Sequence, residues 1–257
     1  MSYRTTEIAS AEEISDNVIH QRLLYPYLKA AEIAQGDVLE IGCGFGRGVS
    51  LIAPSSQSFT GIDKNTALIS ELSAKYPNFR FLAMVIPPLT GLKDESFDMV
   101  VTFQVIEHIE NDRLFVEEIR RVLRKGGKAI ITTPNKKLSL TRNPWHVREY
   151  EIEELRKLLA TYFSKVDIKG ITGNEKVWEY YRANKESVRK FTRFDIFNLQ
   201  YRLPRRWLQI PYDIANRLNR RFLHRNNQQL VSNVTTEDYF LSDNPDACFD
   251  FYAVVEK

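Results

Sequence analysis

The sequence predicts a doubly wound α/β fold, in which a mainly parallel sheet carries helices on both faces. Short apolar runs typical of buried strands alternate with amphipathic helical patterns over residues 36–174. The last apolar run, 248–255, follows the preceding strand pattern only after about 75 residues, which is far longer than a hairpin connection. We therefore expect a helical insertion before the last strand.

The composition predicts a soluble globular protein. The 257 residues are 43% apolar and 12% aromatic, and 36 Lys and Arg nearly balance 33 Asp and Glu, unlike a disordered chain. The N-terminus has no apolar signal region, and no apolar run approaches the roughly 20 residues that cross a bilayer. Cys43 and Cys248 form neither a disulfide framework nor a metal-ligand spacing. We expect a cytoplasmic protein.

The N-terminal segment, 1–35, predicts a helical cap. Helical spacing over 16–34 places Ile19 and Tyr27 on one face, and Pro26 marks a kink or a break in that helix.

The core is expected to span 36–174. Its apolar runs predict strands at 37–41, 59–63, 79–85, 97–103, 128–133 and 164–171. The helical patterns between them predict helices at 65–76, 112–124 and 151–162. In the second of these helices Phe115 and Ile119 share one stripe, and Gly126 and Gly127 supply a stop signal.

The expected insertion spans 175–240, and 241–257 returns the chain to the sheet as its last strand. Residues 175–225 hold thirteen Lys and Arg against five Asp and Glu. Three interpretations stay open: a basic amphipathic surface in peripheral contact with an anionic membrane, a lid that excludes water, and a surface helix with its apolar stripe on the core. No nucleic-acid-binding motif occurs, so we expect no sequence-specific nucleic acid partner.

A glycine-rich turn, GCGFGRG, follows the first predicted strand. Gly42, Gly44 and Gly46 let the backbone turn sharply and approach a nucleotide-like cofactor. Asp63 ends the next predicted strand, where a carboxylate can accept both hydroxyls of a ribose. A dinucleotide fingerprint would need Gly or Ala at the position of Arg47, so the pattern favours S-adenosylmethionine over a dinucleotide.

Four segments in order, VLEIGCGFGRG, GID, SFDMVVTFQVIEHI and LRKGGKAIITTPN, resemble the class I S-adenosylmethionine-dependent methyltransferases. The resemblance is strongest to the group similar to ubiquinone- and menaquinone-biosynthesis methyltransferases (methyltransferase domain type 11), and it covers about residues 36–170. It implies a Rossmann-like sheet of the class I methyltransferase type and S-adenosyl-L-methionine as the cofactor.

The resemblance also implies a set of residues around this cofactor, at the ends of successive strands. The set comprises Glu40, Gly42, Gly44, Gly46, Asp63, Lys64, Met84, Phe103 and Gln104. Many relatives carry an acidic residue after the third strand that binds the adenine amino group. Here Met84 stands in that stretch, so we expect Met84 to pack on the ring and a backbone group to hold the amino group.

The segment Gln104–His108 requires two interpretations. Glu107 and His108 match the second half of an E-x-x-E-H motif with which some similar methyltransferases bind a divalent metal. Gln104 replaces the first carboxylate, and hard cations favour charged oxygen ligands. We therefore expect no metal, with Glu107 and His108 orienting the loop, while His108 remains a candidate general base.

A second candidate segment, TPNKKLSLTRNPWHVREY, follows the last parallel strand. We expect Trp145, Arg148 and Tyr150 to bind substrate, and His146 is the other candidate base. The structural alternative is that Trp145 anchors the loop while His146 and Arg148 bind backbone carbonyls or Glu149.

The predicted activity is methyl transfer from S-adenosylmethionine to a small-molecule or lipid-linked acceptor, with oxygen as the expected attacking atom. Two other classes stay open: a nicotinamide-dependent (NAD) oxidoreductase of Rossmann type, and a non-catalytic protein that binds S-adenosylmethionine.

Overall fold

The computed structural model describes residues 13–193 and 199–257, so the start of the predicted cap and the middle of the predicted insertion lie outside the described residues. In the described part an eight-stranded sheet has the order β3-β2-β1-β4-β5-β8-β6-β7. Its strands are β1 (Asp37–Ile41), β2 (Ser58–Asp63), β3 (Arg80–Ala83), β4 (Phe97–Phe103), β5 (Leu123–Pro134), β6 (Lys165–Gly173), β7 (Tyr239–Ser242) and β8 (Asp250–Glu256). Strands β1 to β5 pair in parallel, and β8 lies antiparallel between β5 and β6. The predicted doubly wound, Rossmann-like α/β class is confirmed.

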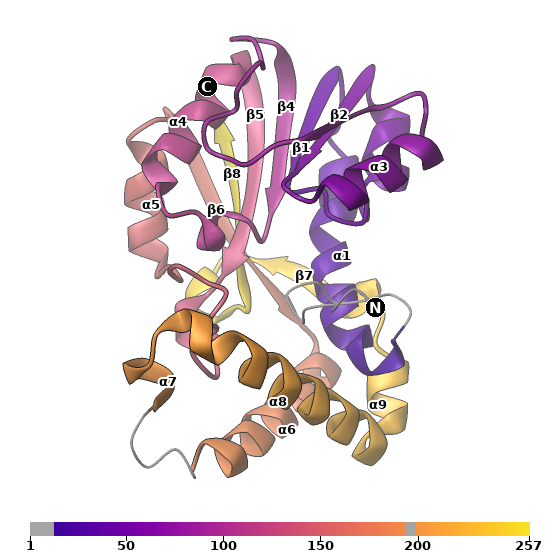
Figure 1. The fold of residues 1–257 in the computed structure, drawn as a ribbon, viewed down its shortest axis with the longest axis vertical. Helices are drawn as coiled ribbons and strands as arrows, with labels where there is room; N and C mark the ends of the chain where they lie inside the picture. The colour runs from indigo at the N-terminus through magenta and orange to yellow at the C-terminus, as the bar shows by residue number, and fades with distance from the viewer. Residues whose placement is uncertain (1–12, 194–198) are drawn as a thin grey trace.

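Helices cover both faces of the sheet (Figure 1). They are α1 (Asn17–Ala31), α2 (Val49–Ile52), α3 (Thr66–Lys75), α4 (Asp112–Val122), α5 (Ile152–Ala160), α6 (Glu175–Thr192), α7 (Leu199–Arg202), α8 (Arg205–Asn226) and α9 (Gln228–Ser232). Because side chains alternate along a strand, Val38 and Val101 join an apolar cluster with α1, α2 and α3. Leu39 and Val100 join a second cluster, with α4 and α5 on the opposite face.

Three local expectations differ from the structure. Helix α1 continues through Pro26, so of the expected kink or break the break does not occur. The glycines at 126 and 127 lie inside β5, which begins at Leu123 because that residue pairs with Phe97 of β4. Strand β7 was not expected; it pairs antiparallel with β6 and precedes the last strand, β8, which starts at Asp250.

The inserted helices α6 and α8 lie across the carboxyl ends of β4 and β5 (Figure 1). A hydrogen bond agrees with this placement, since Trp145, in the loop after β5, donates its indole N–H to Asp213 of α8. The insertion therefore covers the edge of the sheet where parallel α/β proteins bind their ligands. Across the described residues, every helix is too short or too polar to cross a membrane.

Candidate active site

The site lies at the carboxyl ends of β1, β2 and β4. Strands β2 and β4 flank β1 on opposite sides, so the chain reverses its winding at β1. This switch point is where an open parallel sheet leaves a crevice beyond the strand ends.

The glycine loop after β1 has the conformation that its sequence predicts. Gly42, Gly44 and Gly46 adopt φ values of +80°, +49° and +73°, a region that side chains with a Cβ rarely enter. A Cβ at Gly42 would lie 2.4 Å from Cγ2 of Val105, whereas, apart from its chain neighbours, no described residue has an atom within 4 Å of a Cβ position at Gly44. The backbone at Gly44 is therefore open to the approach of a ligand.

Asp63, at the end of β2, is joined directly to this loop. Its Oδ2 accepts a hydrogen bond of 3.0 Å from the Gly44 amide, and its Oδ1 accepts one of 2.8 Å from the Asn65 amide. The two amides hold the carboxylate at the strand end, half-buried beside the open loop. The structure thus brings together the two features from which the sequence predicts adenosyl binding.

Glu40, in β1, is buried beneath the same loop with 1% of its surface exposed. Neither of its oxygens accepts a hydrogen bond of normal geometry from the described residues. Burial raises the pKa of this carboxyl to about 8, an effect that the Tyr27 hydroxyl and Arg47 only partly offset. A buried carboxyl that the described residues satisfy so incompletely suits a cationic group such as the ammonium of the cofactor's methionine part. The residues present therefore fit S-adenosylmethionine.

This geometry predicts that cofactor affinity depends on pH through Glu40. In the free protein Glu40 is protonated below about pH 8, and an ammonium partner favours the ionised form, so binding must release a proton. We expect affinity to rise by up to about tenfold per pH unit between about pH 6 and pH 8 in the native protein, with a flatter profile in Glu40→Gln.

Calorimetric titration with S-adenosylmethionine over this pH range measures the effect. The cofactor's own amine titrates identically with both proteins, so the difference between their slopes isolates Glu40. Equal slopes would remove Glu40 from contact with the cofactor.

The remaining predicted cofactor residues also lie at this edge of the sheet. Lys64 follows β2 and is exposed, and Met84 follows β3 and is half-buried. Phe103 is buried, with its ring 4.6 Å from that of Tyr27. Gln104 adopts a positive φ of +56°, which turns the chain sharply out of β4. Their contacts with the cofactor remain predictions.

A short 3₁₀ turn after β4 (Ile106–His108) carries the predicted Glu107 and His108. Glu107 is buried, accepts a 3.0 Å hydrogen bond from the Thr133 hydroxyl, and has its pKa raised to about 7 by burial. His108 Nδ1 donates to the Trp145 carbonyl at 3.0 Å. Burial, with a smaller effect of His146, lowers the pKa of His108 to about 4. His108 is therefore a neutral imidazole at pH 7 and a weak base.

The two candidate histidines meet at this point. The ring centres of His108 and His146 lie 5.0 Å apart, with the rings nearly perpendicular. His146 Nδ1 lies 2.7 Å from Glu149 Oε1, and its Nε2 lies 2.8 Å from Asn143 Nδ2. Because the amide nitrogen of Asn143 donates, Nε2 carries the lone pair and Nδ1–H donates to Glu149. This arrangement orients a base, since the carboxylate selects the tautomer and the ring direction.

Glu107, His108 and His146 each offer a ligand atom, and these atoms lie within 4.8 Å of one another. Both nitrogens of His146 already have partners, and Glu107 contributes the group's sole carboxylate. A hard cation prefers several charged oxygen ligands, so these residues do not fit magnesium well. The expectation of a metal-free site remains a prediction.

The predicted substrate residues have structural partners. Trp145 is half-buried and donates from Nε1 to Asp213 at 3.1 Å. Arg148 forms an ion pair with Asp112, at the start of α4, and the Tyr150 hydroxyl donates to the same carboxylate at 2.8 Å. The indole contact anchors the loop as the structural alternative expects, and Arg148 also donates to the Glu110 carbonyl at 2.8 Å. The two contacts with Asp112 were not part of that alternative. Substrate binding by the three residues remains a prediction.

One partner of the candidate site could not be found from the sequence. Asp213 lies 68 positions beyond Trp145, and no local pattern links them. Asn143, by contrast, lies on the same predicted loop as His146, and the structure brings its amide to that ring.

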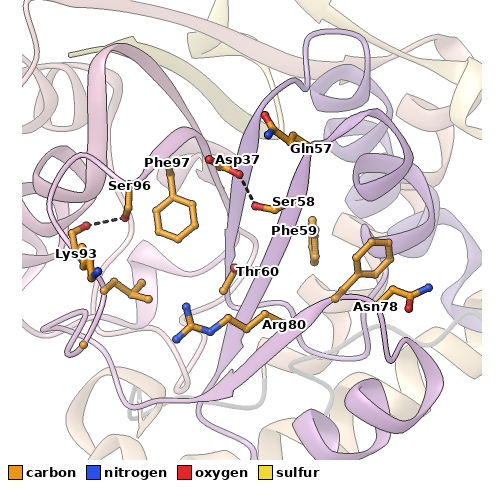
Figure 2. Close-up of a pocket in the computed structure, with 13 residues that line it drawn as sticks. Asp37, Gln57, Ser58, Phe59, Thr60, Asn78, Arg80, Lys93, Ser96 and Phe97 are labelled. Carbon is orange, nitrogen blue, oxygen red and sulfur yellow. Dashed lines mark hydrogen bonds between the residues drawn. The ribbon is translucent and has the colours of Figure 1, made fainter.

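A surface hollow of about 570 Å³ lies elsewhere, at the amino ends of β1, β2 and β3. Figure 2 shows Asp37, Ser58 and Arg80 around it, the first residues of these strands. Parallel strands all start at this edge, so the hollow is opposite the glycine loop and is not part of the candidate site.

Comparisons with known proteins agree with the geometry. Residues 39–131 match the family model described as a methyltransferase domain. The chain is 41% identical over 149 residues to a probable S-adenosylmethionine-dependent methyltransferase of Mycolicibacterium smegmatis, covering 56% of this chain and 55% of the relative. It is 27% identical over 140 residues to the mitochondrial ubiquinone biosynthesis O-methyltransferase of Dictyostelium discoideum, covering 49% of this chain and 40% of the relative.

The chain thus spans about half the length of the curated relatives it matches. Among solved structures, a SAM-dependent methyltransferase from Archaeoglobus fulgidus superposes with a TM-score of 0.55 at 18% identity, over 93% of each chain. That likeness concerns the fold alone. With the family match, the 41% identical relative and the glycine loop joined to Asp63, residues 39–131 form a domain of the class I S-adenosylmethionine-dependent methyltransferases, with S-adenosyl-L-methionine as its cofactor.

Proposed function

We propose that the chain transfers a methyl group from S-adenosylmethionine to a hydroxyl oxygen of a small-molecule or lipid-linked acceptor. The choice of oxygen as the acceptor atom rests on His146. Glu149 holds the ring of this residue at the carboxyl edge of the sheet. A neutral hydroxyl needs a base as the methyl group arrives, and an oriented imidazole supplies one. The similarity to an O-methyltransferase of ubiquinone biosynthesis supports the same choice of atom.

The mechanism assigns distinct tasks to the protein's residues. When bound, S-adenosylmethionine supplies a methyl group on a positively charged sulfur. The glycine loop and Asp63 hold the cofactor, and Glu40 faces its cationic end. The acceptor hydroxyl would displace the Asn143 amide from His146 Nε2, and Nε2 would then take the hydroxyl proton as the methyl group passes from sulfur to oxygen. Glu149 stabilises the imidazolium that results.

His108 contributes in a different way. Its Nδ1–H is committed to the Trp145 carbonyl and its pKa is near 4, so His108 is a weak base and the proposal assigns the proton transfer to His146. His108 packs edge-on against the His146 ring and restricts its orientation. The proposal includes a cytoplasmic location, which two buried, free cysteines suit.

A transfer assay with cell extract tests the proposal. Protein and methyl-labelled S-adenosylmethionine are incubated with aqueous and organic extract fractions, with and without EDTA. We expect label in one fraction at an alkali-stable ether linkage, and the same rate in EDTA.

Three outcomes contradict parts of the proposal. Cofactor binding with no transfer to any fraction indicates a non-catalytic binding protein. Tighter binding of NAD(H) than of S-adenosylmethionine indicates an oxidoreductase. If transfer is lost in EDTA and restored by added metal, a metal is assigned to Glu107, His108 and His146.

A further inference from the structure

Helix α8 carries an apolar stripe that faces solvent. The stripe consists of large apolar side chains at spacings of three and four residues, each more than half exposed: Trp207, Ile210, Ile214, Leu218 and Phe222. Such spacing places them on one face of the helix. The interpretation of this segment as a surface helix with its apolar stripe on the core is therefore wrong.

The inward face of α8 is mostly polar instead. Asp213, Asn219 and Arg220 are buried, together with one apolar residue of this helix, Leu223, which joins the core. Asn219 accepts a 2.6 Å hydrogen bond from Ser187 of α6, and Arg220 lies 3.1 Å from an oxygen of Asp16. Polar contacts thus supply most of the attachment of α8 to the rest of the molecule, and this helix has largely the reverse of the amphipathicity expected on a protein surface. The stripe contributes little to folding, and contiguous exposed apolar area of this kind marks an interaction surface.

The charges on α8 indicate the kind of partner. Arg206, Arg221 and Arg225 are exposed, whereas the sole acidic residue of α8, Asp213, is buried on the inward face. A second copy packed stripe to stripe would bring arginines towards arginines, which disfavours a dimer through this face. An anionic lipid surface meets both features, since its acyl region takes the apolar side chains and its phosphates pair with the arginines.

We propose that α8 docks on bilayers that contain anionic phospholipids, with its apolar stripe towards the acyl chains. Trp207 suits the headgroup level, where aromatic rings with a polar N–H concentrate. Docking also orients the site, because Arg205 of α8 donates to the His146 carbonyl at 3.1 Å and Trp145 is bonded to Asp213. The loop that carries His146 is therefore hydrogen-bonded directly to the docking helix. The surface does not depend on methyl transfer, so it can be tested without cofactor.

Co-sedimentation with vesicles tests the proposal. The whole chain is mixed, without cofactor, with phosphatidylcholine vesicles or with vesicles that also contain phosphatidylglycerol. We expect sedimentation with the anionic vesicles at low salt, at least tenfold less with phosphatidylcholine alone, and progressive release as salt rises.

Two variants test whether vesicle binding depends on the stripe or on exposed apolar residues in general. Ile214→Ser with Leu218→Ser should reduce the bound fraction at least tenfold without lowering the melting temperature, because both side chains are exposed. Phe240→Ser, a matched change of an exposed residue in β7, should leave vesicle binding unchanged.

Absence of sedimentation at low salt, or equal binding by the stripe variant, overturns the proposal. A dimer in analytical ultracentrifugation that the stripe variant abolishes assigns the surface to a second copy and overturns it as well. An inactive protein that still binds anionic vesicles leaves this inference standing and removes only the proposed methyl transfer.

Discussion

His146→Ala should lower kcat by roughly 100- to 10,000-fold, the range that a positioned general base contributes. Without the imidazole the acceptor hydroxyl keeps its proton while the methyl group transfers, which raises the barrier. Cofactor affinity should stay within about twofold, because we expect the glycine loop and Asp63, and not His146, to hold the cofactor. Single-turnover kinetics with saturating cofactor, alongside calorimetry, separates the two quantities.

Two further variants distinguish loss of the base from structural damage. Glu149→Gln keeps the shape of the side chain, but its amide can donate to Nδ1 and stabilise the wrong tautomer, so kcat should fall by at least about 100-fold. His224→Ala removes a half-buried imidazole from α8 and should leave kcat unchanged. If His146→Ala retains kcat within about threefold, the base assignment is incorrect and a deprotonated acceptor becomes the better account.

Asp63→Ala should weaken S-adenosylmethionine binding by about 1–3 kcal/mol, or roughly 5- to 150-fold. The substitution removes the carboxylate that we expect to accept the ribose hydroxyls, and it leaves the Gly44 and Asn65 amides without their partner. Calorimetric titration measures the loss directly.

Asp37→Ala is the matched control for this experiment. Asp37 begins β1 at the amino edge, where it accepts from Ser58 and Arg124. Its removal costs a comparable set of hydrogen bonds far from the cofactor, so affinity should not change. Equal affinities for Asp63→Ala and the native protein would place the ribose elsewhere.

The cofactor half of the site could be predicted because its determinants are local. Glycines that must adopt positive φ lie directly after an apolar strand, and Asp63 ends the neighbouring strand in parallel register. Parallel strands end at one edge of the sheet, so these groups lie close together however the rest of the chain folds. The hydrogen bond between Gly44 and Asp63 is the direct result.

The acceptor half could be predicted only in part. The sequence segments around His108 and His146 predicted both residues as candidate bases. Their edge-on contact, however, depends on how the loop after β5 folds back over the turn after β4. The amides of Val147 and Arg148 both donate to the Glu107 carbonyl, which fixes that return. Backbone contacts between distant segments leave no pattern in the sequence, because every residue except proline offers the same donor.

The sequence by itself determined the class of fold, the strands of the parallel core and the cofactor loop, because periodicity and glycine placement act over a few residues. It also determined that α8 has an apolar face and a polar one. Only the tertiary structure decided which face turns outward, since helical spacing is the same in either orientation. Polar partners at Ser187 and Asp16 draw the polar face inward, and the apolar stripe is left in solvent for a partner.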